Sequence, residues 1–258
     1  MALITFTSDF GYSDHYVSAV KAKILSQNPD LRIINISHDI DRFNLAHGSH
    51  VISQVFRDFP PGTVHLVAIN SHNNLSEAHI ALKLEDHFFV GSNNGIFGLI
   101  SEKDPSEIVK LEGVNHKFSS FPAKDIFAGA VAHLASGKKL KNLGKPYTNF
   151  QKMIGRKVKA TKSQISGNVI RVDHYGNLIT NIEKEVFDLL SKGNKYSIIF
   201  GREQAQEINV GYGKIEDGDC FIIFNSGGLL EIGINKGNAA ELLGLEYDSP
   251  VNITFLLE

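Results

Sequence analysis

The sequence predicts a two-domain protein of the α/β class: an N-terminal sheet covered by helices on both faces, followed by a small antiparallel β-barrel domain. Three observations carry this prediction. Up to about residue 150, apolar strands alternate with amphipathic helices, and nearly continuous apolar strands are typical of a sheet buried on both faces. Beyond about residue 160, short strands follow one another between turns of Gly, Asn and Asp. We therefore expect an α/β domain over residues 1–153 and a β-barrel domain over residues 160–258.

The N-terminal elements follow from the periodicity of apolar residues. The stretch ALITF predicts a first strand, and YVSAVKAKIL, with apolar residues at helical spacing, predicts the helix after it. The last helix of the series is expected to end at Gly137, because glycine is preferred just beyond a helix C-terminus. In chain order, strands are predicted at 2–6, 31–37, 62–70, 78–84 and 87–92, and helices at 16–25, 44–59 and 123–137.

The C-terminal part reads as consecutive β segments. Tight turns join neighbouring segments in sequence, and such segments usually pair antiparallel. A chain of them without intervening helices predicts a small barrel or sandwich. The predicted strands lie within residues 167–182, 195–200, 219–225, 229–234 and 250–257.

Composition limits the classes of partner. The chain has 258 residues, 42% hydrophobic and 21% charged, with a formal net charge of −2. No basic stripe is present, so nucleic-acid binding is not expected, and the expected partners are small molecules or further copies of the chain. No apolar run approaches the roughly 18 residues that cross a bilayer, and the first strand leaves no room for a signal peptide. We expect no membrane partner and a cytoplasmic location.

Cysteine and histidine usage argues against disulfide or metal chemistry. The single cysteine, Cys220, lies in the apolar stretch DCFIIF and is expected to be a buried, unreactive thiol. The eleven histidines include no HxH or HExxH arrangement, so no metal is expected. GxGxxG, Walker and GxSxG motifs are also absent from the sequence.

The segment TSDFGYSDHY places two acids, Asp9 and Asp14, between a predicted strand and a predicted helix. The N-terminus of a helix commonly binds an anion, which these carboxylates would repel. A ligand with hydroxyl donors or a positive charge fits them better, for example a ribose diol, an ammonium or a sulfonium. In the alternative interpretation Asp14 caps the helix that begins at Tyr16, and Asp9 stabilises the turn.

A second group of polar residues lies in VDHYGNLITNI, where Asp173 and Asn177 flank a tight turn at Gly176. The simpler interpretation is a hairpin in which Asp and Asn serve turn chemistry. The later stretch FNSGGLLEIGINKGNAAELLGL is rich in Gly and Asn, so its backbone could approach a flat ligand closely.

Seven stretches, in order along nearly the whole chain, resemble the S-adenosyl-L-methionine hydroxide adenosyltransferase family, which also includes fluorinating and chlorinating enzymes. The resemblance runs from about residue 3 to residue 255. Its motifs are TSDFGYSDHYVSAVKAKI, NISHDIDRFNLAHG, FPPGTVHLVAIN, FVGSNNGIFGL, FPAKDIFAGAVAHLASG, VDHYGNLITNI and FNSGGLLEIGINKGNAAELLG.

The resemblance implies a homotrimer that binds S-adenosylmethionine, without a further cofactor, between the N-domain of one subunit and the C-domain of its neighbour. It also implies a role for each matching position. Asp9 would hold the ribose hydroxyls, with Asp14 toward the methionine end. The remaining positions are Asp173 for the methionine amine, Asn177 for a ligand contact, Ser226 for the methionine carboxylate, and Phe43 and Phe121 for the walls around the ribose and the reacting carbon.

The chain departs from the family at the triad of Asp, Arg and His that prepares the attacking water. Reading the motifs without gaps places Asn70, Glu77 and Pro122 at these positions. Asn and Pro offer no base, and Glu reverses the charge of the arginine. We take Asn70 and Glu77 as the candidate catalytic residues. His72 or His79 could substitute, or the loop that carries them could be polar surface.

The implied function is cleavage of S-adenosylmethionine to adenosine and L-methionine by water attack at ribose C5′, slowed by the altered triad. The sequence leaves three alternatives open. The chain could bind S-adenosylmethionine or adenosine without converting it, or be a purely structural oligomer. It could also use another nucleophile such as a halide, because halide-using members differ near the position of Ala123.

Overall fold

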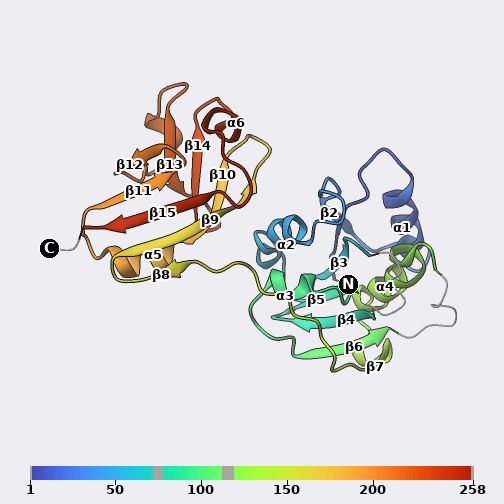
Figure 1. The fold of residues 1–258 in the computed structure, drawn as a ribbon. Helices are drawn as coiled ribbons and strands as arrows, with labels where there is room; N and C mark the ends of the chain where they lie inside the picture. Colours follow the sequence, from blue (N-terminus) through green and yellow to red (C-terminus); the bar gives the residue numbers. More distant parts are fainter. Residues whose placement is uncertain (1, 72–77, 112–118, 257–258) are drawn as a thin grey trace. The chain divides into compact units, whose positions relative to one another are not determined.

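The computed structural model describes residues 2–71, 78–111 and 119–256. The chain divides into two compact units, Met1–Gly155 and Arg156–Glu258 (Figure 1). Each unit contains one large sheet. The predicted mixed α/β class with two sheets is therefore confirmed.

The N-terminal unit contains a seven-stranded sheet in the order β2-β1-β3-β5-β4-β6-β7. The first four strands of this order are parallel, and helices connect β1 to β2 and β2 to β3, as is usual between parallel strands. β4 runs antiparallel to both β5 and β6, and β6 runs antiparallel to β7, so the sheet is mixed. The strands are β1 Ile4–Ser8, β2 Ile33–Ser37, β3 Val64–Ala68, β4 His79–Leu84, β5 His87–Ser92, β6 Glu107–Leu111 and β7 Gly144–Pro146.

The helices of this unit are α1 Tyr16–Leu25, α2 Leu45–Ser53, α3 Ile96–Ile100 and α4 Ala128–Ala135. The prediction for α1 is confirmed at both ends. Asn44 caps α2 by accepting a hydrogen bond from the backbone N–H of His47 at 2.9 Å. The helix predicted to reach residue 59 ends at Ser53, and a short 3₁₀ turn follows at Phe56–Asp58. The first five residues predicted for the last helix form a π-helical turn, Ala123–Phe127.

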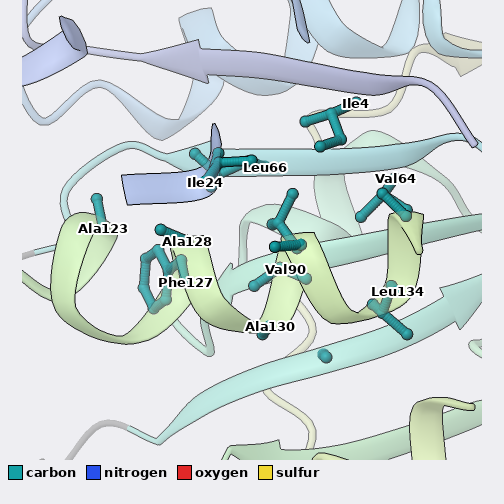
Figure 2. Packing of buried hydrophobic residues seen from close by; sticks show 14 of the residues in the cluster. Ile4, Ile24, Val64, Leu66, Val90, Ala123, Phe127, Ala128, Ala130 and Leu134 are labelled. Carbon is teal, nitrogen blue, oxygen red and sulfur yellow. The ribbon is translucent and has the colours of Figure 1, made fainter. Parts of the chain in front are cut away.

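Neighbouring residues of β3 pack into different hydrophobic clusters because side chains alternate between the faces of a strand. Leu66 belongs to a cluster with buried residues of α1 and α4, and Val67 to a cluster with buried residues of α2 and α3. Figure 2 shows part of the first cluster, in which Phe127 and Leu134 belong with the strand residues Val64, Leu66 and Val90. This packing holds β1 and β3, whose carboxyl ends lead into the loops of the candidate site.

The C-terminal unit contains an eight-stranded antiparallel sheet in the order β12-β11-β15-β9-β10-β14-β13, with β8 paired to β9. The sheet is curled around its own hydrophobic cluster (Figure 1). The elements are β8 Lys159–Ala160, β9 Gln164–Val172, β10 Leu178–Glu183, α5 Lys184–Ser191, β11 Tyr196–Phe200, β12 Glu203–Ala205, β13 Cys220–Phe224, β14 Leu229–Ile234, α6 Ala239–Leu243 and β15 Pro250–Phe255.

Several elements have no counterpart in the sequence prediction. α5 is an eight-residue helix between two strands, and it packs Phe187 into the core of the unit. α6 is capped by Asn238, whose side chain accepts from the backbone N–H of Glu241 at 3.2 Å. Both helices are too short to be distinguished by periodicity from strand and turn segments.

The predicted burial of Cys220 is wrong, because this residue is exposed. It is the first residue of β13, the terminal strand in the order of the sheet, and only the next three residues of the strand are buried. In the ranges that the structure describes, no helix is long and apolar enough to cross a membrane. The same ranges contain no group of three or more metal-binding side chains.

Candidate active site

A cavity of about 420 Å³ lies in the N-terminal unit where several loops follow the carboxyl ends of parallel strands. This edge of an α/β sheet is a common place for ligands, because loops from neighbouring strands converge there. The cavity brings together four predicted site residues, Asp9, Phe43, Asn70 and Phe121. The other residues that line it are Phe10, Tyr16, Arg42, Ser71, Ser120 and Pro122.

Asp9 ties two of these loops together. Its Oδ2 atom accepts hydrogen bonds from the backbone N–H of Phe43 at 2.9 Å and of Asn70 at 3.0 Å. Both donors have positive φ, 63° and 47°, a conformation that costs energy for residues other than glycine. Asp9 therefore has a structural role, as in the alternative interpretation, but it links two loops instead of stabilising its own turn. Within the described residues its other oxygen, Oδ1, accepts no hydrogen bond.

Aromatic rings form much of the cavity wall. The ring of Phe121 makes edge contacts with Phe10 at 5.7 Å and Tyr16 at 5.4 Å between centroids. Phe43 is 61% exposed and lines the same cavity. Such π faces favour a cationic ligand, because the ring quadrupole attracts positive charge.

A hydroxyl fixes the backbone that carries Phe121. Ser119 Oγ accepts from the backbone N–H of Phe121 at 3.0 Å and donates to Asp125 Oδ2 at 2.7 Å. The carbonyl of Phe121 accepts from the N–H groups of Lys124 and Asp125 at the start of the π-helical turn. A turn of this kind is common at functional sites, where it adjusts the position of side chains.

Asp14 does not share this cavity. It is exposed, and the N-cap of α1 is its neighbour His15, which makes no side-chain capping bond. The alternative in which Asp14 caps α1 is therefore wrong. Arg42, by contrast, lines the cavity although the sequence interpretation did not single it out. The only feature of the sequence that could have indicated Arg42 was its position next to Phe43, a predicted ligand contact.

The structure describes two of the three positions that match the family triad. Asn70 and Pro122 both line the cavity, and the carbonyl of Asn70 accepts from Asn94 Nδ2 at 3.3 Å. Glu77 and His72 lie outside the described residues. His79 is buried, with its ring 5.1 Å from that of Phe127 and its Nδ1 atom 3.3 Å from Ser92 Oγ. It is not among the described residues that line the cavity.

A buried histidine supports the segment that carries Asp9. His38 Nδ1 lies 2.7 Å from Ser8 Oγ, and the carbonyl of His38 accepts from the N–H of Gly11 at 2.8 Å. Burial, with a contribution from the charge of Lys21, lowers the pKa of His38 to about 4. His38 is therefore neutral near pH 7. Among the described residues its Nε2 atom has no hydrogen-bond partner.

A second cavity, of about 550 Å³, lies in the C-terminal unit and includes Asn177. Asp173 Oδ1 accepts from the backbone N–H of Tyr175 at 2.9 Å and of Asn177 at 2.8 Å, and Gly176 has a φ of 85°. The predicted turn chemistry is therefore confirmed. The other residues that line the cavity are Tyr175, Tyr212, Phe221, Ile234, Asn235, Lys236, Gly237 and Asn238.

A buried carboxylate, Glu231, joins several polar groups at this cavity. It accepts from Asn177 Nδ2 at 3.0 Å, from the hydroxyl of Tyr212 at 3.2 Å and from Asn225 Nδ2 at 3.2 Å. Burial, reinforced by the nearby Glu231 charge, raises the pKa of Tyr212. The sequence interpretation did not single out Glu231. The available signal was one acid inside the apolar stretch LLEIGI.

Ser226 lies in the exposed turn between β13 and β14. Its neighbour Asn225 shares Glu231 with Asn177, so this turn adjoins the same polar network. No hydrogen bond joins Ser226 to Asp173 or Asn177 among the described residues. The structure thus places Asp173 and Asn177 together, with Ser226 next to their network.

Comparison with family models matches both parts of the chain. A model described as the SAM hydroxide adenosyltransferase N-terminal domain matches residues 4–144. The model of the corresponding C-terminal domain matches residues 167–252.

Curated proteins and solved structures match nearly the full length. The chain is 31% identical to a Methanocaldococcus jannaschii protein named (R)-S-adenosyl-L-methionine hydrolase, over 98% of this chain and 96% of the relative. A protein of the same name from Thermus thermophilus is 27% identical, with 98% and 100% covered. A fluorinase from an Actinoplanes species is 25% identical, with 70% and 72% covered. The crystal structure of a conserved protein from Thermotoga maritima has a TM-score of 0.89 at 31% identity, with 98% and 100% covered.

Proposed function

The chain belongs to the SAM hydroxide adenosyltransferase family, and on this premise we propose that it cleaves S-adenosyl-L-methionine to adenosine and L-methionine. The observation that carries the proposal is the full-length similarity to proteins named (R)-S-adenosyl-L-methionine hydrolase. The cavity around Asp9 supports it, because it combines a carboxylate oxygen that is open to a diol with aromatic faces suited to a sulfonium. We further propose that the substrate has the (R) configuration at sulfur, which is the configuration in the names of these relatives.

The reaction is a displacement at the ribose C5′ atom. A water oxygen forms the new bond to C5′ as the C5′–S bond breaks, and the electron pair of that bond returns to sulfur. Methionine leaves as a neutral thioether, and the water gives up one proton. Asp9 Oδ1 would accept from the ribose hydroxyls, while Phe43 and Phe121 would enclose the ribose and the reacting carbon, which aligns the water behind the C–S bond.

Water activation differs from that of the family triad. Asn70, at the first triad position, can orient a water through its amide but cannot remove a proton. Pro122, at the third position, offers no side-chain donor or acceptor. We propose Glu77 as the group that accepts the proton. Loss of an optimal general base typically costs a factor of about 10² to 10⁴ in rate, so we expect slow turnover.

The assembly is part of the same proposal. We propose a homotrimer in which Asp173, Asn177 and Ser226 of one copy complete the site that contains Asp9 of another. Two cavities, one in each unit, support this arrangement, because each contains predicted ligand contacts.

We also propose that helices cover both faces of the N-terminal sheet and that the C-terminal sheet closes as a small barrel. The cytoplasmic location stays a prediction.

Incubation of the protein with each sulfur epimer of S-adenosylmethionine, followed by chromatography, tests the activity. We expect equal amounts of adenosine and methionine from the (R) epimer, above a blank without protein. A folded protein that binds adenosine but releases no product would refute the hydrolase and favour the binding alternative. A halogenated nucleoside formed only with added halide would favour the other nucleophile.

A further inference from the structure

Glu231 is a buried acid without a basic partner in the described part of the chain. Its side chain is 5% exposed and lies in β14 between Leu230 and Ile232, which are fully buried. Burial of a carboxyl group in an apolar strand is costly unless its oxygens are hydrogen-bonded. Here both oxygens accept, Oε1 from Asn177 and Tyr212 and Oε2 from Asn225. Two of these three donors line the second cavity.

Asn225 has one allowed orientation. Its Oδ1 atom accepts from the backbone N–H groups of Gly227 at 3.0 Å and Leu229 at 3.1 Å. Its amide NH₂ group therefore has to face Glu231, because a rotated amide would oppose donors to donors. One oxygen of Glu231 is thus committed to Asn225.

Asn177 is held in one orientation by two carboxylates. Its amide nitrogen donates to Asp173 Oδ2 at 3.3 Å and to Glu231 Oε1 at 3.0 Å. These two bonds use both N–H groups of the amide, so its side chain can only accept from a ligand. The oxygen lies over Gly233, where an added Cβ would approach it to 2.5 Å. A glycine at this position makes room for that oxygen.

We propose that Glu231 is a positioning residue of the second cavity, which fixes Asn177 as a hydrogen-bond acceptor and so selects a ligand edge that donates. The exocyclic amino group of adenine is such an edge. The inference rests on the proposed function, because a nucleoside is the ligand expected there. The raised pKa of Tyr212 agrees with it, since a phenol next to a carboxylate stays protonated and donates.

Two nucleosides test the inference on the native protein. Adenosine and purine riboside differ at one position, where purine riboside has hydrogen in place of the amino group. Titration by calorimetry should show purine riboside binding at least about tenfold more weakly, because the acceptor is left unpaired. Equal binding of the two nucleosides, or binding of neither, would overturn the inference.

The variant Glu231→Gln tests the role of the acid itself. The two asparagines donate to different oxygens of Glu231, and in glutamine one of these oxygens becomes an NH₂ group that cannot accept. We expect the preference for adenosine over purine riboside to fall toward one. Glu203→Gln, at an exposed glutamate of β12, is the matched control and should keep the native preference. A folded Glu231→Gln protein with an unchanged preference would overturn the inference.

The test of this inference depends neither on the folding of the variant nor on the proposed activity. The comparison on the native protein needs no variant, so equal binding of the two nucleosides overturns the inference even if Glu231→Gln fails to fold. Cleavage of S-adenosylmethionine is measured separately. If the native protein discriminates the two nucleosides, Glu231→Gln loses this preference and no adenosine is released from S-adenosylmethionine, the proposed activity fails while the role of Glu231 stands.

Discussion

The backbone N–H groups of Phe43 and Asn70 converge on a single oxygen atom, Oδ2 of Asp9, although the two residues follow different strands. Each residue has a positive φ that needs external support. Asp9 therefore has two tasks at one side chain: Oδ2 holds the cavity wall, and Oδ1 remains open to a ligand. The two tasks can be separated experimentally.

Asp9→Asn should impair binding more than folding. The amide oxygen can still accept from Phe43 and Asn70, but the NH₂ group would replace the oxygen that accepts from the ribose diol. We expect a loss of about 1.5 to 3 kcal/mol in adenosine affinity and a smaller change in the free energy of unfolding. Calorimetry and urea denaturation measure the two quantities.

Asp9→Ala should impair both, because it removes the support of the two loops as well. A 2′-deoxy ligand should bind the native protein more weakly and lose less affinity on this substitution, because one partnered hydroxyl is already gone. If the ratio between the two ligands is the same in the native protein and in the variant, Asp9 does not hold the diol.

Stability should fall as the pH drops below about 6.5, because two buried histidines resist protonation. Burial, with the neighbouring His87, lowers the pKa of His65 to about 3, and burial lowers that of His38 to about 4. Below the unfolded pKa of about 6.5, the unfolded chain binds more protons than the folded chain. Each histidine then removes up to about 1.4 kcal/mol of stability per pH unit, until its folded pKa is passed.

Urea denaturation between pH 7.5 and pH 5 measures this slope. The described groups that contact His65 are Thr5, His87 and the rings of Phe56, Phe59 and Phe89. A His65→Gln variant cannot take up a proton, so it should show a shallower slope than the native protein. The same slope in both proteins would show that His65 is not a source of the pH dependence.

Gly233→Ala should disturb the second cavity. The added Cβ would meet Asn177 Oδ1 and the ring of Phe221, so the amide has to shift. We expect adenosine affinity to fall about tenfold or more, with about 1 to 3 kcal/mol lost from stability. Gly213→Ala is the control, because its Cβ would have nothing within 4 Å. Equal effects of the two substitutions would contradict the role assigned to Gly233.

A shared site predicts that two inactive variants restore activity when mixed. Asp9→Ala and Asn177→Ala would each remove one side of every site in a trimer. In random mixed trimers about a quarter of the sites would combine two native sides, because each site draws one side from each of two copies. Activity near that level after subunit exchange supports the assembly. A monomer at micromolar concentration by light scattering would contradict it.

The sequence predicted the strands and helices of the N-terminal unit best where apolar periodicity is strong, as in α1. It failed for short elements such as α5, whose eight residues carry too little periodicity to separate helix from turn. The helix from residue 44 ends early at Ser53, before Phe56–Asp58 forms a tighter turn. Cys220 was misjudged because the order of strands in a sheet is not readable from one strand.

The candidate site was predictable where its residues follow strands. Asp9, Phe43 and Asn70 meet because the carboxyl ends of parallel strands share one edge of the sheet. Glu231 could not be found in this way. An acid in an alternating strand normally faces solvent, and only the contacts with Asn177 and Asn225 reveal that this one is buried and hydrogen-bonded.

Individual strand pairs span very different sequence distances, and this has a consequence for the order of folding. β13 pairs with β14 across a short turn, whereas β1 pairs with β3, which brings Thr5 against His65 over 60 positions. Closure of long loops costs entropy before contacts repay it, so long-range parallel sheets form slowly. We expect the β13–β14 hairpin, which contains Glu231, to gain protection from hydrogen exchange before β1 and β3 do. The chain would then complete the Asp9 cavity last, although ribosomes synthesise that half first.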